Sequence, residues 1–322
     1  MSHRTDPRPP APAPTGARRA ARRAPLLALT VGVAALLAGP GPPAARAESP
    51  GVVTHLLRLS TGDGKETTGA LFLPATRPPR AGVVVVHGYG GNFYSGVPGH
   101  LAPALAQRGF AALAVNLRDH DAGPKTTLFE EGRWDVLAAV DELARRRAEP
   151  VVVVGHSLGT NTVLHVAAEA RDPRLRALVL VAGPGNAFEW NVRLFGKERA
   201  TAELEEAQRL HAAGRGREII PVDLGPLGRV LYSADHLVSL RGPATRSDPY
   251  RNAATVTVPV LVVHAGADRL VDPDVARRLR AAATAAPRAD LLEVPGAEHG
   301  FAGHQAALAD AIERWLADAL TR

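Results

Sequence analysis

The sequence places a serine in a setting that is typical of an enzymatic nucleophile. Four valines at 151–154 are followed directly by Gly-His-Ser-Leu-Gly at 155–159, and a run with helical spacing comes next. A serine between two glycines, where a buried strand turns into a helix, is the pattern of a nucleophile elbow. We expect strained backbone at Ser157, which needs tiny neighbours such as Gly155 and Gly159. The helix behind it offers N–H groups to a negative charge that develops there.

Two other interpretations of this stretch are weaker. An ordinary glycine-rich turn between a strand and a helix can have the same letters, and Gly-x-Ser-x-Gly occurs often by chance. A phosphate-binding loop is disfavoured because neither Gly-Lys-Ser nor Gly-Lys-Thr follows. The strand before the motif and the helix after it therefore favour a nucleophilic serine.

Apolar strands and amphipathic helices alternate along most of the chain. The expected strands lie at 52–59, 67–73, 82–87, 110–117, 151–154, 175–181, 259–263 and 291–294. The expected helices lie at 101–108, 128–147, after the elbow to about 171, and at 200–215, 273–285 and 305–320. All-apolar strands that alternate with helices predict an α/β fold, a mostly parallel central sheet with helices on both faces.

The alternation of strands and helices stops between residues 186 and 256, where the sequence is irregular and rich in Gly, Pro, Tyr and His. We therefore divide the chain into a leader at 1–47, a first core part at 48–185, a helical cap insertion at 186–256 and a second core part at 257–322. Because ligands bind at the carboxyl ends of parallel strands, we expect the insertion to cover the site.

The chain resembles the α/β-hydrolase family over roughly residues 80 to 320. Four motifs carry the resemblance, in the family's order: His-Gly-Tyr-Gly-Gly at 87–91, Gly-His-Ser-Leu-Gly at 155–159, Gly-Ala-Asp at 266–268 and Gly-Ala-Glu-His-Gly-Phe at 296–301. Serine, acid and histidine follow one another in this order in the family's catalytic triad. Four motifs at successive strand ends are far more specific together than any one alone.

The resemblance implies a role for five residues. Ser157 matches the nucleophile, His299 the base that takes its proton, and Asp268 the acid that orients the imidazole. The backbone N–H groups of Tyr89 and Leu158 match the oxyanion hole, with Gly88 as an adjacent possibility. Neither a cofactor nor a metal is implied.

Two residues compete with this assignment. His304 is an alternative base, but it lies where the C-terminal helix begins and lacks the glycine neighbours of His299. Asp268 has a second interpretation as a turn or helix cap, although Asp272, directly before a proline, is the better N-cap for the next helix. After the strand at 175–181 the sequence reads Ala-Gly-Pro-Gly, so that strand end offers no alternative acid.

Several other residues near these motifs have plainer interpretations. His87 and His156 flank glycine turns, and we expect them to pack or to form hydrogen bonds there. The polar run at 118–121, Arg-Asp-His-Asp, is either a metal site or a set of loop-anchoring salt bridges, and salt bridges are favoured. Four aromatic residues of the insertion either line an acyl pocket or form the cap's own core: Trp190, Phe195, Tyr232 and Tyr250.

Composition narrows the class of protein. The 322 residues carry a formal net charge of +6, but residues 1–47 hold seven Arg and one Asp, so the remainder is neutral. The folded part therefore gives no electrostatic case for binding nucleic acid. The absence of cysteine excludes disulfides, thiolate metal sites and a cysteine nucleophile.

Residues 1–47 read as a secretory signal peptide. An apolar stretch at 26–39, too short to be a stable membrane span, is followed by Ala45-Arg46-Ala47, which fits a small-x-small cleavage site before Glu48. Arg22-Arg23 suggests a twin-arginine route, and an ordinary Sec signal with an arginine-rich start is the alternative. A retained membrane anchor is less favoured, and we expect secretion.

The sequence thus predicts a secreted serine hydrolase that cleaves a carboxylic ester, with a small-molecule or lipid-like acyl substrate. An aminopeptidase or an acyltransferase on the same triad is the alternative, and Glu189, Glu203, Glu205 and Glu206 are candidates to hold a substrate amine. Serine at the elbow disfavours an epoxide hydrolase or a haloalkane dehalogenase. A non-catalytic binding protein on the same fold is the alternative from another class. Acyl specificity and oligomeric state are not determined by the sequence.

Overall fold

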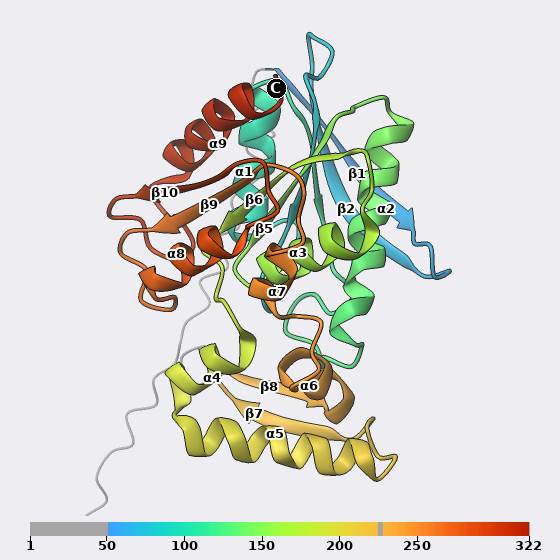
Figure 1. Ribbon diagram of the computed structural model, residues 1–322. Helices are drawn as coiled ribbons and strands as arrows, with labels where there is room; N and C mark the ends of the chain where they lie inside the picture. The colour runs from blue at the N-terminus through green and yellow to red at the C-terminus, as the bar shows by residue number, and fades with distance from the viewer. Residues whose placement is uncertain (1–50, 225–227, 322) are drawn as a thin grey trace, which may run out of the picture. The chain divides into compact units, whose positions relative to one another are not determined.

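An eight-stranded sheet organises the chain, in the order β1-β2-β4-β3-β5-β6-β9-β10 (Figure 1). The structure is a computed structural model that describes residues 51–224 and 228–321, so the predicted leader lies outside the described residues. The strands are β1 (Val52–Ser60), β2 (Glu66–Pro74), β3 (Gly82–Val86), β4 (Ala111–Val115), β5 (Val151–His156), β6 (Leu175–Val181), β9 (Val260–Ala265) and β10 (Ala289–Val294). β1 pairs with β2 and β2 with β4 in antiparallel fashion, and the other neighbours are parallel. The predicted mostly parallel sheet is confirmed.

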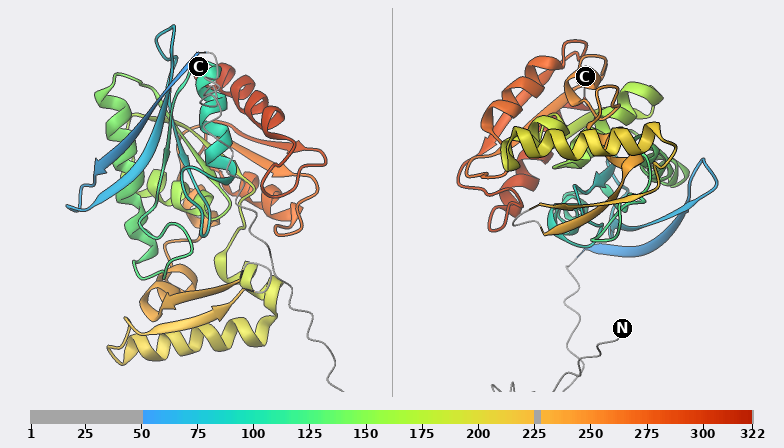
Figure 2. Two further views of the ribbon diagram at one scale, coloured as in Figure 1. Left: turned by 180° about the vertical axis from the view of Figure 1, so that it is seen from behind. Right: turned by 90° about the horizontal axis from the view of Figure 1, so that it is seen from below.

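Helices cover both faces of this sheet, which is why its central strands are apolar throughout. They are α1 (Gly96–Gln107), α2 (Gly132–Arg145) with a short 3₁₀ turn η1 (Phe129–Glu131) before it, α3 (Gly159–Ala170), α7 (Pro249–Ala253), α8 (Pro273–Ala282) and α9 (Gln305–Ala319). Val83 and Val85 of β3 pack in one core with residues of α1 and α9. Val84 and Val86 pack in the other core with residues of α2, α3 and α8. The views from the front and from behind show the two helical layers (Figures 1 and 2).

The parallel register brings the motif-bearing loops to one edge of the sheet. Val86 at the end of β3 pairs with Gly155 of β5, and His156 pairs with Val181 of β6. Val181 pairs in turn with Val263 of β9, and Ala265 pairs with Val294 of β10. Because these strands end side by side, the loops that follow β3, β5, β9 and β10 emerge next to one another. These are the loops that carry Tyr89, Ser157, Asp268 and His299.

The segment between β6 and α7 forms a small layer with its own sheet, drawn yellow to orange in Figure 1. Its elements are α4 (Ala187–Phe195), α5 (Lys197–Ala212), β7 (Ile219–Asp223), β8 (Arg229–Ser233) and α6 (Ala234–Arg241). We call residues 187–241 the cap. The antiparallel β7–β8 hairpin was not predicted, because its strands are short, half exposed and interrupted by Pro221.

The cap has a core of its own and separate ties to the main sheet. Leu210, Val222, Tyr232 and Leu237 are buried together within it. Lys125, in the loop after β4, pairs with β8: its N–H donates to the Leu231 carbonyl at 2.8 Å, and its carbonyl accepts from the Ser233 N–H at 2.9 Å.

The chain rejoins the main body before the predicted insertion ends. Ala253 and Val256 are buried in the core beneath α3 and α8 rather than in the cap. Asp248 caps α7 by accepting from the N–H groups of Tyr250 and Arg251. The cap layer therefore ends near Arg241, and the rest of the insertion is connecting chain that packs on the main core.

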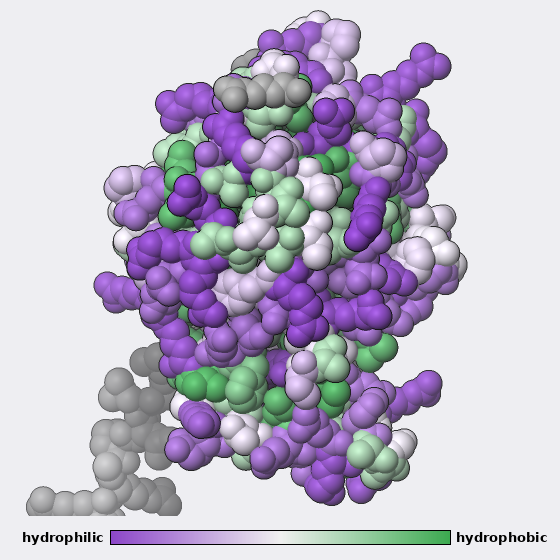
Figure 3. Space-filling view, in the orientation of Figure 1, coloured by the Kyte–Doolittle hydropathy of each residue, from purple (hydrophilic) through white to green (hydrophobic). Residues whose placement is uncertain are grey.

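The molecular surface is largely polar on the face drawn in Figure 3, with apolar residues also gathered at the height of α4 and α6. Among the helices of the described residues, none is both long enough and apolar enough to cross a membrane.

Candidate active site

Ser157 stands on a strained turn between β5 and α3. Its φ angle is +52°, in the left-handed region that serine rarely adopts. A Cβ on Gly155 would lie 2.4 Å from the carbonyl oxygen of Gly159, and a Cβ on Gly159 would lie 2.5 Å from that of His87. A Cβ on Gly88 would lie 2.6 Å from the Cβ of Ser157 itself. These glycines let three backbone segments close around the serine.

Asp268 and His299 are in direct contact, although 31 positions separate them in the chain. Nδ1 of His299 lies 2.8 Å from Oδ2 of Asp268. The other carboxylate oxygen, Oδ1, accepts from the N–H groups of Leu270 at 2.8 Å and Val271 at 3.0 Å. The Asp268 side chain is fully buried, whereas that of His299 is 19% exposed. This geometry fixes the imidazole with Nδ1 on the carboxylate and Nε2 free to face a substrate.

The pKa of Asp268 results from opposing effects. Burial alone would raise it, because a charged carboxylate loses its hydration. The hydrogen bond and charge of His299, together with the two backbone N–H groups, outweigh burial and lower the pKa below its usual value. Asp268 is therefore ionised at neutral pH and can stabilise a protonated His299.

Ser157 and His299 line one cleft with a volume of about 180 Å³. Trp190 and Leu270 also line this cleft, so the cap and the loop of the acid both border it. Among the hydrogen bonds of the described residues, none joins the Ser157 hydroxyl to His299. Catalytic hydrogen bonds are often long or misaligned without substrate and tighten when it binds.

Tyr89 and Leu158, whose N–H groups are the predicted oxyanion hole, lie beside Ser157. Both residues line the small cavity that Ser157 also borders. Within the described loops, no backbone or side-chain oxygen accepts a hydrogen bond from either N–H group. Leu158 precedes the first turn of α3, where the helix dipole adds a partial positive charge. Two free donors beside a nucleophile are what an oxyanion hole requires.

A model of the alpha/beta hydrolase family matches residues 83–311, which is more than half of the chain and contains all four motifs. The chain belongs to the α/β-hydrolase family. None of the curated proteins matches the sequence.

Solved esterase structures share the fold of this α/β-hydrolase. The esterase domain of a Rhodothermus marinus protein has 21% identity and a TM-score of 0.56, with 82% of this chain and 98% of that chain covered. Est1E from Butyrivibrio proteoclasticus with bound ferulic acid has 18% identity and a TM-score of 0.60, with 83% and 100% covered. The Pyrococcus furiosus esterase Pf2001 has 15% identity and a TM-score of 0.59, with 83% and 91% covered. At such identities the likeness concerns the fold alone.

The two histidines beside glycine turns position the loops of the hydrolase site. His87 is 2% exposed, its Nδ1 lies 2.7 Å from the Gly88 carbonyl oxygen, and its Nε2 accepts from the Leu117 N–H at 2.9 Å. Burial lowers the pKa of His87 to about 4, so the ring is neutral at pH 7. His156 Nε2 lies 2.9 Å from the carbonyl oxygen of His299, and burial followed by the nearby His299 lowers its pKa to about 3. Both rings therefore form hydrogen bonds at the turns, as predicted.

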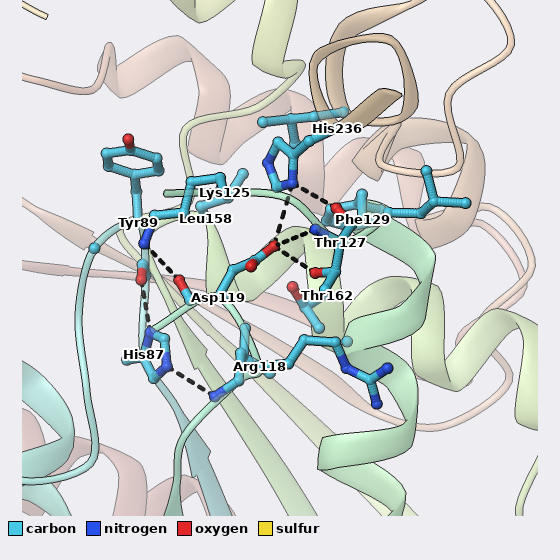
Figure 4. Close-up of a pocket in the computed structure, with 17 residues that line it drawn as sticks. His87, Tyr89, Arg118, Asp119, Lys125, Thr127, Phe129, Leu158, Thr162 and His236 are labelled. Atoms are coloured by element: carbon cyan, nitrogen blue, oxygen red, sulfur yellow. Dashed lines mark hydrogen bonds and ion pairs between the residues drawn. The ribbon is translucent and has the colours of Figure 1, made fainter. Parts of the chain in front are cut away.

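The polar run at 118–121 is held by hydrogen bonds and ion pairs within the protein. Arg118 pairs with Asp135 at 3.1 Å and with Asp63 at 2.8 Å, which ties the β1–β2 turn to the loop after β4. The Asp119 carboxylate accepts from the Thr127 hydroxyl and lies 3.3 Å from Nδ1 of His236 (Figure 4). Salt bridges were the favoured interpretation of this run. Within the described residues, no group of three or more His, Asp or Glu side chains is arranged to hold a metal ion.

Lys125 fastens the loop after β4 from within. Its buried Nζ donates to the carbonyl oxygens of Asp119 at 2.6 Å and Asp121 at 2.5 Å. Burial lowers the pKa of Lys125. The lysine also lines a cavity of about 60 Å³ with Tyr89, Leu158 and His236. The sequence analysis did not single out this residue, because a lone lysine in a loop gives no sign that it is buried.

The four aromatic residues of the insertion separate into distinct roles. Trp190 borders both cavities that contain Ser157, and its Nε1 donates to the Leu270 carbonyl at 3.1 Å. Tyr232 is fully buried in the cap core and also borders the smaller cavity. Phe195 packs against the cap core, and Tyr250 packs against the main core.

The two competing residues lie elsewhere. His304 is the N-cap residue of α9, and its Nδ1 contacts the Ala302 carbonyl. Asp272 is the N-cap of α8, as predicted, and accepts from the Asp274 N–H.

Arg241 is a second residue near the site that the sequence analysis missed. It is the last residue of α6, its side chain is 3% exposed, and it borders the smaller cavity with Ser157. No motif surrounds it, and an arginine at a helix end is ordinarily solvated, so only the folded cap reveals its position.

Proposed function

We propose that this α/β-hydrolase is a secreted serine hydrolase that cleaves carboxylic esters. The observation that carries the proposal is the contact of Asp268 with His299 beside Ser157, which stands on a strained elbow and borders the same cleft. The esterases with the same fold support ester hydrolysis. Est1E binds ferulic acid, a carboxylic acid, and hydrolysis of an ester by this protein would also release a carboxylic acid.

Each group has one role in the reaction. The Ser157 hydroxyl attacks the ester carbonyl carbon while Nε2 of His299 takes its proton, and Asp268 stabilises the resulting imidazolium. The oxyanion accepts hydrogen bonds from the N–H groups of Tyr89 and Leu158. The carbon–oxygen bond to the alcohol then breaks, and His299 returns the proton to the departing alkoxide. Water, deprotonated by His299, hydrolyses the acyl-enzyme and frees Ser157.

A Ser157→Ala variant, measured with p-nitrophenyl esters of increasing chain length, tests the proposal. We expect kcat/KM to fall by about 10⁴-fold or more for every ester that the wild type cleaves. Ser60→Ala, at the exposed end of β1, is the matched control and should keep wild-type turnover. A Ser157→Ala variant that retains wild-type activity would refute the assignment.

Covalent labelling separates the enzyme from a binding protein on the same fold. A fluorophosphonate should modify the wild type at Ser157, as located by peptide mass spectrometry, and should not modify Ser157→Ala. Folded wild-type protein that stays unlabelled and cleaves no ester would favour the binding protein.

Export is tested by recovering the protein from the culture medium and determining its first residue. We expect the secreted protein to begin at Glu48. A protein that keeps residues 1–47 would contradict secretion with removal of a signal peptide.

An aminopeptidase on the same triad is less well supported by the cap. Of the glutamates considered for holding a substrate amine, three are ion-paired with arginines: Glu189 with Arg278, Glu203 with Arg199, and Glu206 with Arg209. The charged side chain that borders the small cavity beside Ser157 is a cation, Arg241. A site lined in this way would repel an ammonium group.

A further inference from the structure

The small cavity beside Ser157 holds one charged side chain in an otherwise apolar wall. Ser157, Leu158 and Tyr89 form the side toward the nucleophile, and Trp190, Tyr232 and Arg241 come from the cap. Pro184, Ala187 and Leu240 complete the lining. Arg241 is the one residue with a charged side chain in this lining, so the cavity can bind a charged group of a substrate through Arg241 alone.

The Arg241 guanidinium is buried without full hydrogen bonding. Its side chain is 3% exposed, and neither Nε nor Nη1 has a hydrogen-bond partner among the described residues. Nη2 reaches the Tyr232 hydroxyl at 3.4 Å, and the guanidinium carbon lies 5.2 Å from the centre of the Tyr232 ring. Buried charged donors without acceptors are costly, and a planar pair of N–H groups is suited to bind a carboxylate.

The carboxylate that pairs with Arg241 is shared with a second arginine. Glu203 Oε2 lies 3.8 Å from Nη1 of Arg241, too far for a hydrogen bond. The same glutamate accepts from Nε of Arg199 at 2.9 Å, and its Oε2 accepts from the Asn191 side chain at 3.3 Å. Two guanidinium groups therefore share the Glu203 carboxylate, and Arg241 has no carboxylate of its own at hydrogen-bond distance.

The position of His299 tells which end of the ester this cavity receives. The leaving alcohol must lie near His299, because the imidazole returns a proton to it. His299 borders the larger cleft of about 180 Å³ and does not border the cavity of Arg241. The alcohol therefore belongs in the larger cleft, and the acyl group extends from Ser157 into the smaller cavity toward Arg241.

We propose that Arg241 determines specificity for esters whose acyl group ends in a free carboxylate, the half-esters of dicarboxylic acids. This inference rests on the proposed ester hydrolysis at Ser157. The cavity volume of about 20 Å³ has room for little more than one water molecule, so the cavity must widen to admit the carboxylate and only a short acyl chain fits. In the bound state the carboxylate accepts from Nε and Nη2 of Arg241, whose N–H groups point the same way, so Nε gains the acceptor that it lacks.

The test compares substrates that differ in charge and hardly in shape. Monoethyl succinate and monoethyl glutarate are paired with the ethyl esters of succinamic and glutaramic acid, in which an amide replaces the carboxylate. Release of the free acid is followed by mass spectrometry in the full-length mature protein. We call the ethyl esters with a terminal amide the half-amides. We expect the wild type to cleave the half-esters with at least a tenfold higher kcat/KM than the matched half-amides.

Arg241→Gln and Arg241→Lys separate recognition from a structural role. We expect Arg241→Gln to lose on the order of ten- to a hundred-fold in kcat/KM on the half-esters and at most about threefold on the half-amides. Arg241→Lys should restore part of the preference, because it keeps the charge without the planar fork. Arg215→Gln, at an exposed position in the cap that pairs with Glu218, should leave both substrates unaffected.

Two outcomes would overturn the inference. One is an equal loss on both substrates in Arg241→Gln, which indicates a structural role alone. The other is a wild type without preference for the half-esters, which decides against the inference even if the Arg241 variants do not fold. In both cases Ser157-dependent hydrolysis of neutral esters would leave the proposed function intact, whereas loss of all Ser157-dependent hydrolysis would refute that function instead.

Discussion

Asp268 uses its two carboxylate oxygens for different partners, and only one of them faces His299. Oδ2 lies 2.8 Å from Nδ1 of His299, while Oδ1 accepts from the N–H groups of Leu270 and Val271. The backbone bonds shape the turn that begins after β9, so the same side chain holds the loop and orients the imidazole. The two tasks can be separated by substitution.

Asp268→Asn should abolish most activity while it preserves the turn. The asparagine carbonyl can keep the bonds to the two backbone N–H groups, but its NH₂ then faces Nδ1 of His299 and selects the wrong tautomer. We expect kcat to fall by about 10⁴-fold. The free energy of unfolding, measured in urea, should change by about 1 kcal/mol or less at pH 7. Asp274→Asn, exposed at the start of α8, should leave kcat unchanged. An active Asp268→Asn enzyme would exclude this role for Asp268.

Replacing Ser157 by glycine should give a more stable protein than replacing it by alanine. The φ of +52° at this position strains any L-residue, whereas glycine adopts it freely. The greater flexibility of glycine in the unfolded chain offsets part of this gain. We expect the free energy of unfolding of Ser157→Gly to be about 0.5–1 kcal/mol higher than that of Ser157→Ala. Neither variant should hydrolyse esters.

The order should reverse at Ser60, which lies in extended β1. There Ser60→Gly should be less stable than Ser60→Ala, because no strain is relieved. If glycine and alanine ranked alike at both positions, the strain at Ser157 would not contribute to stability.

Alanine should not be tolerated at the two glycines that flank the elbow. A Cβ at Gly155 or Gly159 would lie about 2.5 Å from backbone oxygens that cannot move independently. We expect Gly155→Ala and Gly159→Ala each to lose about 3 kcal/mol of stability and most of the esterase activity. Gly123→Ala, where a Cβ would meet open space, is the control and should behave as wild type in thermal unfolding and turnover. Wild-type melting of the flanking variants would contradict the packing described here.

His87 should make the protein less stable in mild acid. Its pKa is about 4 in the folded state and 6.5 in an unperturbed ring, so between these values the unfolded chain binds a proton that the folded chain excludes. Stability is therefore highest above pH 6.5 and falls as the pH drops towards 4, by up to about 3 kcal/mol from this group. Protonation of Nε2 would also remove the acceptor for the Leu117 N–H.

The check is urea unfolding of wild type and His87→Gln from pH 4 to 8. Because the variant lacks the titrating ring, its stability should depend less steeply on pH, by about 1.4 kcal/mol per pH unit within that window. His55→Gln, on the exposed side of β1, should keep the wild-type slope. Parallel pH curves for wild type and His87→Gln would disprove the assignment to His87.

The parts of the fold that could be read from the sequence are those with strong local patterns. The valines of β3 and β5 are buried on both faces of the sheet. Because a central strand is covered on both faces, apolar residues occupy successive positions along it. The cap hairpin escaped prediction because β7 and β8 are covered on one side only and contain Pro221 and exposed residues. Helix α1 begins earlier than the predicted 101–108, at Gly96, because two glycines and Pro98 obscure its first turns.

The sequence by itself determined which side chains are candidates for catalysis and which strands they follow. Glycines mark positions where backbones must approach closely, so the spacing around Ser157 and His299 is a local property that survives in the linear chain. The tertiary structure shows the contact of Asp268 with His299 that the family resemblance had implied, and it alone decided that Arg241, from a helix of the cap, becomes buried beside Ser157. Burial and charge balance depend on which distant segments meet, and no local pattern at Arg241 encodes that meeting.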